Sequence, residues 1–185
     1  ANVLASRTAN SRPRVLVIDD RVPYPSLGAG YPRSAHLLRA LDDMGLNVTF
    51  FPMLFPTDDW QQVYDCLPPG VEVMLDVGQA QLGSFLAERQ GLYQYIVVSR
   101  EHNMAAFNRI TAGKPELLAG VTLIYDAEAV SAPREVLRRR LMGEQIGDDE
   151  LNAAIRAEVE LARDAQHIVA VSEREADYFR KFGFD

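Results

Sequence analysis

The chain has 185 residues, of which 48% are hydrophobic and 24% charged, a composition typical of one folded, water-soluble domain. Its formal net charge of −7 argues against a nucleic-acid partner, because such a surface needs clustered positive charge. No apolar run approaches the ~20 residues of a membrane-spanning helix, and the first residues lack the pattern of a signal peptide. We therefore expect a cytoplasmic protein and leave peripheral association with a membrane open.

The chain begins with a polar stretch and then enters a regular α/β pattern. Residues 1–13 lack periodicity and are predicted to be a flexible tail or linker, with a single domain over residues 14–185. Val15 to Ile18 form a continuous β-branched apolar run, as expected for a parallel strand covered on both faces, and Asp19 and Asp20 follow it. A helix is predicted from about Pro32 to Gly45 after a loop rich in proline and glycine.

The strand and helix unit then repeats along the chain. Further strands are predicted at Val48–Phe51, Val71–Leu75, Tyr95–Ser99, Val121–Tyr125 and His167–Val171. Amphipathic helices are predicted at Asp58–Leu67, at Glu150–Arg163 and from Ser172 to about Phe182, the last opening on a capping box. This alternation predicts a Rossmann-like, doubly wound parallel sheet of about six strands, whose ligands bind beyond the C-terminal ends of the strands.

The loop after the first strand is one candidate binding element. Gly28 and Gly30 permit close approach of a ligand to the backbone, and the helix that follows offers free N–H groups to an anion. A phosphate or a sugar oxygen fits such a place. The loop is too long for the dinucleotide-binding glycine fingerprint, so a purely structural turn is an equal alternative.

Polar residues after the fourth and fifth strands are the candidates for chemistry. Arg100, His102 and Asn103 follow the fourth strand, and a histidine there can act as a hydrogen-bond partner or general base. Asp126 and Glu128 close the fifth strand, where carboxylates can orient sugar hydroxyls or accept a proton. The alternatives are that His102 only packs and that Asp126 caps a helix. The chain has a single cysteine and no Cys or His cluster with metal-ligand spacing, so no metal site is predicted.

Several segments together resemble the N-terminal domains of GT-B glycosyltransferases of the family-4, glycogen-synthase-like type. The segments that carry the resemblance are VLVID, PYPSLGAGYPRSAHLLRALDDMGLNVTFFP, YIVVSREHN, LIYDAEA with the following PRE, and IVAVSEREADYFRKFG. The resemblance covers nearly all of residues 14–183. It implies an acceptor-binding domain that works with a C-terminal nucleotide-sugar-binding domain of the same polypeptide, which this chain lacks.

The resemblance also implies roles for individual residues. Gly28, Ala29 and Gly30 would form a loop near the donor diphosphate. His102 and Asp126 would be catalytic, and four residues would contact a glycan or small-molecule acceptor, namely Arg100, Asn103, Glu128 and Arg134. The implied activity is sugar transfer from a nucleotide-sugar in bacterial surface polysaccharide synthesis. No cofactor is expected in this chain, which should be inactive by itself.

Two other functions fit parts of the sequence. In a response-regulator receiver domain, Asp19 and Asp20 would bind Mg²⁺ and Asp76 would accept the phosphoryl group, but the long loop after Asp20 and the short segment between Ser99 and Lys114 argue against it. A non-catalytic binding module with the same fold is the other alternative, since fold does not fix function.

Overall fold

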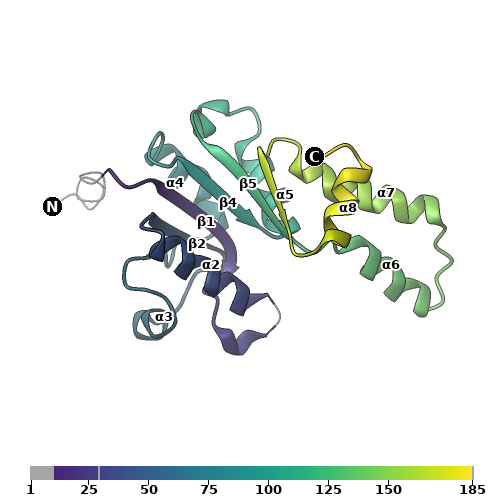
Figure 1. Cartoon of the computed structure of the whole chain (residues 1–185), viewed down its shortest axis with the longest axis horizontal. Helices are drawn as coiled ribbons and strands as arrows, with labels where there is room; N and C mark the ends of the chain where they lie inside the picture. The colour runs from purple at the N-terminus through teal and green to yellow at the C-terminus, as the bar shows by residue number, and fades with distance from the viewer. Residues whose placement is uncertain (1–10, 29, 185) are drawn as a thin grey trace.

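The computed structural model describes residues 11–28 and 30–184, in which six parallel strands form one sheet with the order β3-β2-β1-β4-β5-β6 (Figure 1). The strands are β1 Arg14–Arg21, β2 Asn47–Phe55, β3 Glu72–Val73, β4 Tyr95–Ser99, β5 Thr122–Glu128 and β6 His167–Ala170. The chain winds outward from β1 to β3 and then returns past β1 to build the other half of the sheet. The prediction of a Rossmann-like, doubly wound α/β sheet is confirmed.

Helices cover both faces of this sheet. They are α2 Tyr31–Asp43, α3 Trp60–Cys66, α4 Leu82–Glu88, α5 Glu101–Thr111, α6 Ala132–Leu141, α7 Asp148–Val159 and α8 Glu173–Lys181. Side chains of a strand alternate between the two faces. In β1, Val15 and Val17 therefore pack in a cluster with residues of α2 and α3, whereas Leu16 and Ile18 pack with residues of α4, α5, α7 and α8. This double burial explains the continuous apolar run in the sequence.

The third strand is much shorter than predicted. Instead of five residues it has two, Glu72 and Val73, which pair with Thr49 and Phe50 of β2. If the pairing continued in this register, Pro52 would lie opposite Leu75, and a proline has no N–H to extend the ladder. The chain instead turns away at Asp76, which has a positive φ of 62°.

Two predicted boundaries can be compared with the structure: the end of the N-terminal tail and the start of the last helix. Residues 1–10 of the predicted tail lie outside the described residues, and residues 11–13 precede β1 without helix or strand. At the other end, Ser172 Oγ accepts a hydrogen bond from the backbone N–H of Glu175, as the capping box predicted. Helices α6 and α7 lie at the end of the molecule that carries β6 (Figure 1).

Candidate functional site

The C-terminal ends of β1, β4 and β5 bring acidic and basic side chains together. β4 lies between β1 and β5, and Ser99 at its end is paired in register with Asp126. Asp19 and Asp20 end β1, Arg100 follows β4, and β5 continues to Glu128. Because all strands are parallel, these ends lie at one edge of the sheet, which is where ligands bind in such folds.

Arg100 is the centre of this cluster. Its Nε lies 2.7 Å from Oδ1 of Asp19 and 3.4 Å from Oδ2 of Asp20, and its Nη1 lies 3.2 Å from Oε2 of Glu128. The guanidinium also stacks 4.8 Å from the ring centroid of Tyr31. Arg100 has a φ of 74°, a conformation that costs a non-glycine residue about 1 kcal/mol or more. Such backbone strain persists where surrounding contacts hold it, as the three carboxylates do here.

The two aspartates of β1 have separate partners. Asp19 is fully buried and accepts hydrogen bonds from Ser34 Oγ at 2.8 Å and from the backbone N–H of Asp20 at 2.7 Å. Asp20 Oδ1 lies 2.5 Å from His102 Nε2 and accepts a bond of 2.9 Å from the side-chain amide of Asn103. Each aspartate thus supports Arg100 and ties it to a neighbouring helix.

The contact between His102 and Asp20 shifts the pKa of both groups. The hydrogen bond to Asp20 raises the pKa of His102 above its usual 6.5, against the desolvation of the half-buried ring. Burial acts to raise the pKa of Asp20, but the bonds from His102 and Asn103 and the charge of Arg100 prevail and lower it. The arrangement therefore favours a protonated imidazole paired with a carboxylate, and Nε2 is engaged with Asp20.

Asp126 is buried and bound by neighbouring side chains. Its two carboxylate oxygens accept bonds of 2.7 and 2.8 Å from the guanidinium of Arg33, and Ser99 Oγ adds a bond of 3.2 Å. Its side chain is only 2% exposed. Asp126 thus binds Arg33 and Ser99 and supports the site, and the catalytic role expected for it stays a prediction.

Glu128 faces the cavity from the end of β5, also with a positive φ, of 54°. Burial, together with the charges of Asp19 and Asp126, raises its pKa against the opposing charges of Arg100 and Arg33. Its Oε1 is buried and has no hydrogen-bond partner among the described residues, and the same holds for Nη2 of Arg100. One ion pair thus contains a buried acceptor and a buried donor that no described residue satisfies.

A cavity of about 490 Å³ lies beside this ion pair. Five of the predicted site residues line it, namely Gly30, Arg100, His102, Glu128 and Arg134, together with Arg33, Glu101, Ala127, Ala129, Ser131 and Val171. Asn103 does not line it: the side chain is 1% exposed and donates to Asp20 and to the carbonyl of Ser99. Asn103 thus supports Asp20, and its expected contact with an acceptor stays a prediction.

The glycine loop differs from its expected geometry. A Cβ on Gly30 would lie 2.5 Å from Oε1 of Glu128, whereas a Cβ on Gly28, which has a φ of 78°, would meet nothing within 4 Å. Close approach at Gly30 is therefore to Glu128, and Ala29 lies outside the described residues. Arg33 and Ser34, which hold Asp126 and Asp19, carried no signal in the sequence that would have assigned them to the site.

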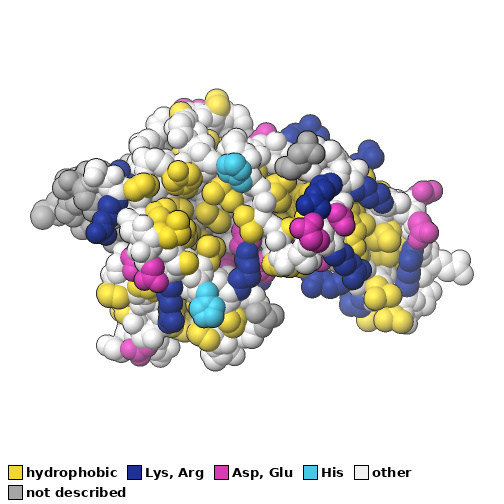
Figure 2. Space-filling model, viewed as in Figure 1, with side chains coloured by type: hydrophobic (Ala, Val, Ile, Leu, Met, Phe, Trp, Pro, Cys, Tyr) yellow, Lys and Arg dark blue, Asp and Glu magenta, His cyan; other side chains and the backbone are white. Residues whose placement is uncertain are grey.

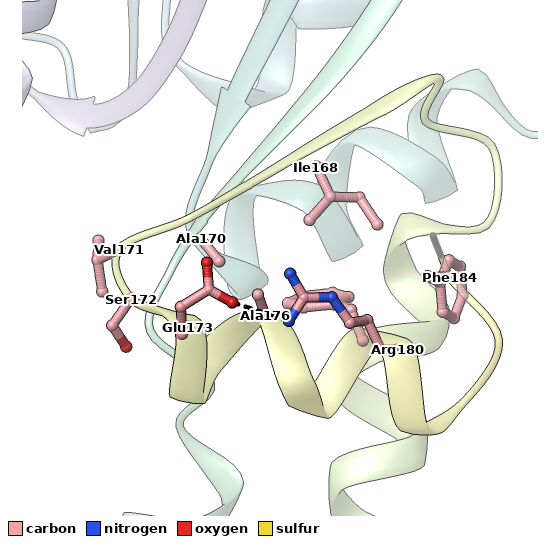
Figure 3. A pocket seen from close by; sticks show the side chains of 9 residues that line it. Ile168, Ala170, Val171, Ser172, Glu173, Ala176, Arg180 and Phe184 are labelled. Carbon is pink, nitrogen blue, oxygen red and sulfur yellow. Dashed lines mark hydrogen bonds and ion pairs between the residues drawn. The ribbon is translucent and has the colours of Figure 1, made fainter.

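A second cavity, of about 290 Å³, lies between β6 and α8 (Figure 3). Apolar side chains such as Ile168, Ala176 and Phe184 line it, and an ion pair between Glu173 and Arg180 lies across its rim. It contains none of the residues that the sequence predicted for the site. We therefore place the candidate site in the larger cavity beside Arg100 and Glu128.

The strand order excludes the receiver arrangement. A receiver places the strand of the phosphoacceptor next to the strand that carries the acidic pair. Here β2 lies between β1 and β3, so Asp76, which follows β3, is separated from Asp19 and Asp20 by a whole strand. Within the described residues no three His, Cys, Asp or Glu side chains are grouped to hold a metal ion. No helix of the same residues has the length and apolar character to cross a membrane.

Comparison with known proteins supports the fold. No family model and no curated protein matches the sequence. Among solved structures, the chain is similar to sucrose-phosphate synthase from Thermosynechococcus elongatus, with a TM-score of 0.61 at 13% sequence identity. The match covers 94% of this chain and 46% of the synthase chain, so this chain spans less than half the length of that protein. The domain therefore shares its Rossmann-like fold with part of that protein.

Proposed function

We propose that this chain is the acceptor-binding domain of a glycosyltransferase that transfers a sugar from a nucleotide-sugar to a glycan or other hydroxyl-bearing acceptor. The fold likeness to a glycosyltransferase and the position of the cavity at the C-terminal ends of β1, β4 and β5 support the proposal. A second domain would bind the nucleotide-sugar and close the cavity.

The ion pair between Arg100 and Glu128 is the observation that carries this proposal. Buried polar atoms normally have partners, and an orphaned pair at a cavity is best explained by a ligand. A sugar hydroxyl both donates and accepts a hydrogen bond. The two atoms left without partners are Nη2 of Arg100, a donor, and Oε1 of Glu128, an acceptor. Both are buried, so a hydroxyl would pair with them only after the Glu128 side chain turns away from Gly30 toward the cavity.

The surrounding residues fix the orientation of the Arg100 guanidinium in that ion pair. Asp19 and Asp20 hold the guanidinium of Arg100 from one side, and Tyr31 covers its face. Both Arg100 and Glu128 have positive φ, which places backbone strain at the site. Such rigid support is what acceptor positioning requires, because a reacting hydroxyl must be held in line with the sugar being transferred.

Replacement of Glu128 by Gln in the full-length protein tests the proposal. The variant keeps the side-chain shape but loses the charge that pairs with Arg100, so acceptor-dependent kcat/KM should fall by about 10- to 100-fold. Glu88→Gln on the exposed end of α4 is a matched control and should transfer sugar like the wild type. Equal rates in the two variants would rule out the assigned acceptor site. Turnover of a nucleotide-sugar by residues 1–185 alone would contradict the need for a second domain.

A further inference from the structure

Two carboxyl groups meet at the wall of the cavity. Glu101, the first residue of α5, lines the cavity, and its side chain is hydrogen-bonded to that of Glu158, near the end of α7. On the surface around α6 and α8, by contrast, acidic side chains lie beside arginines (Figure 2), as in the ion pair between Glu173 and Arg180. A hydrogen bond between two carboxyl groups requires a proton on one of them.

The start of α6 holds Glu158 in place. Its Oε1 accepts a bond of 2.6 Å from the backbone N–H of Ser131. Its Oε2 accepts bonds of 2.8 Å from the backbone N–H of Ala132 and of 3.1 Å from Ser131 Oγ. Ser131 also lines the cavity. Three bonds from one short segment leave the Glu158 carboxyl little freedom to move, so its position relative to Glu101 is fixed.

The pair gains and loses a proton near neutral pH. Burial, the hydrogen bond to Glu101 and the negative charge of that residue raise the pKa of Glu158 to about 7, against the backbone bonds from Ser131 and Ala132, which lower it. Above that pH, Glu158 carries a charge next to Glu101. A proton added to the pair then restores the bond between the two carboxyl groups.

The other groups of the lining that could take a proton already have ionic partners. Glu128 forms an ion pair with Arg100, and His102 contacts Asp20. Glu101 forms no ion pair within residues 11–28 and 30–184, which the structure describes. A carboxylate that lines the cavity without a cationic partner is a suitable proton acceptor.

Several charged or titratable groups surround the pair. Those that line the cavity with Glu101 are Arg33, Arg100, His102, Glu128 and Arg134. The arginines remain protonated at neutral pH and cannot accept a proton. Tyr125 of β5 is also close to the pair, and its pKa is raised by burial and by the charges of Glu158 and Glu101, so it keeps its proton. The lining therefore offers Glu101, backed by Glu158, as the route for a departing proton.

We propose that Glu101 accepts the proton of the acceptor hydroxyl and passes it to Glu158. This inference rests on the proposed function. As the hydroxyl oxygen forms its bond to the anomeric carbon of the sugar, the bond from that carbon to the nucleotide breaks, and the nucleotide leaves with the electron pair. The hydroxyl proton moves to Glu101 and, through the hydrogen bond between the carboxyl groups, to Glu158. The transfer replaces the repulsion between two charges by a hydrogen bond.

The pH dependence of sugar transfer by the full-length protein tests this relay. Acceptor-dependent kcat/KM of the wild type should rise with pH and level off above about 7, because Glu158 must be ionised to receive the proton. Glu158→Gln cannot take a proton, so this rise should disappear, and kcat at about pH 8 should fall by about tenfold or more. Glu101→Gln should lower kcat by about 100-fold or more with acceptor KM nearly unchanged.

Two further variants make the result specific to the pair. His102 also has a raised pKa, but His102→Gln should keep the rise with pH, because Glu101 and Glu158 are unchanged. Glu116→Gln alters an exposed carboxylate and should keep both the rate and the pH profile of the wild type. A rise with pH that persists in Glu158→Gln, or a wild-type kcat in Glu101→Gln, would overturn the relay.

The same measurements separate the relay from the proposed function. Loss of acceptor-dependent transfer in Glu128→Gln, with wild-type transfer in Glu101→Gln, would overturn the relay alone. Wild-type transfer in Glu128→Gln would overturn the acceptor site and with it the relay. In this chain without any sugar donor, NMR of the carboxyl carbons should show Glu158 titrating at about pH 7, and at lower pH in Glu101→Gln. Titration of Glu158 at the same pH in both proteins would overturn the pairing whatever the activity.

Discussion

Arg33 and Asp126 form a two-pronged ion pair that joins α2 to the end of β5, with oxygen to nitrogen distances of 2.7 and 2.8 Å. The Asp126 side chain is 2% exposed and that of Arg33 is 36% exposed. Two parallel N–H to oxygen bonds fix both the distance and the plane of the partners. The pair therefore sets where α2, with Gly30 at its start, lies relative to Glu128.

Loss of the carboxylate at Asp126 should destabilise the protein. Asp126→Asn leaves Arg33 facing a neutral amide, and breaking a buried ion pair typically costs about 3 to 5 kcal/mol. Because Arg33 is partly exposed and water can reach it, we expect about 2 kcal/mol less free energy of unfolding. Urea denaturation followed by circular dichroism measures the difference.

The exposed pair between Arg138 and Glu135 is the matched control. Both side chains are more than half exposed, so Glu135→Gln should leave the free energy of unfolding nearly unchanged. A similarly small change in Asp126→Asn would show that the buried pair does not stabilise the fold, and its proposed supporting role would fail.

The sheet could be predicted because its signals are local. β1 and β6 appear in the sequence as short apolar runs, each followed by a turn or a helix cap, and the parallel order follows from their alternation with helices. The sequence pattern is less reliable for predicting which side chains at the end of a helix are buried, because tertiary packing determines their exposure. Met44 has the spacing of the inner face of α2 but is exposed, because the helix ends at Asp43 and the chain turns through Gly45 at a φ of 80°.

The partners within the site could not be predicted in the same way. Arg33 and Asp126 are 93 residues apart, and Arg100 and Asp19 are 81 residues apart. Strand order determines which of these side chains meet, and no local pattern reports it. The sequence placed His102 and Glu128 at the sheet edge correctly, because residues that follow parallel strands share that edge. It could not show that Asp126 forms an ion pair with Arg33.

The contact between His102 and Asp20 should make stability depend on pH. The pKa of His102 is raised above 6.5 in the folded protein, so its contribution is fully present below pH 6.5 and is lost as the pH rises through the folded pKa. His102→Gln removes this component. The difference in unfolding free energy between wild type and variant should therefore be larger below pH 6.5 than well above it.

Urea titrations at several pH values measure that difference. Asn103 continues to donate to Asp20 in the variant and Arg100 stays near it, so Asp20 keeps its other two partners. A difference between wild type and His102→Gln that does not vary with pH would mean that the imidazole is not charged in its contact with Asp20.

A second pH effect is expected at the base of α6. Glu158 accepts bonds from the backbone N–H groups of Ser131 at 2.6 Å and Ala132 at 2.8 Å. Burial and the neighbouring Glu101 raise its pKa to about 7. In the folded state Glu158 therefore ionises at a higher pH than in the unfolded chain. Its contribution to stability is present near pH 4.5 and is lost as the pH rises to about 7.

Replacing Glu158 by Gln should flatten this dependence. The variant keeps one oxygen to accept from the start of α6 but cannot ionise, so its stability should fall less than that of the wild type between pH 4.5 and pH 7. Urea titrations at the two pH values give the comparison. Parallel losses in both proteins would show that Glu158 ionises at its ordinary pKa and that Glu101 does not affect it.

The contact between Gly30 and Glu128 leads to a prediction about acceptor binding. Gly30 has ordinary helical φ and ψ angles of −74° and −21°, so alanine would suit the backbone and should by itself be neutral or slightly stabilising. Its Cβ would, however, lie 2.5 Å from Oε1 of Glu128. The carboxylate must then move away from Gly30, which would disturb its ion pair with Arg100.

Gly30→Ala should therefore weaken acceptor binding by about tenfold with little change in stability, and it should do so only through Glu128. A double-mutant cycle tests that dependence: in the background of Glu128→Ala, adding Gly30→Ala should have no further effect on the acceptor Kd, measured by NMR titration. Gly28→Ala is the contrasting control, because its φ of 78° and ψ of −175° predict a stability cost of about 1 to 3 kcal/mol while its Cβ meets no atom within 4 Å. Additive effects of Gly30→Ala and Glu128→Ala would place the action of the glycine elsewhere, as a loop that approaches a donor phosphate would require.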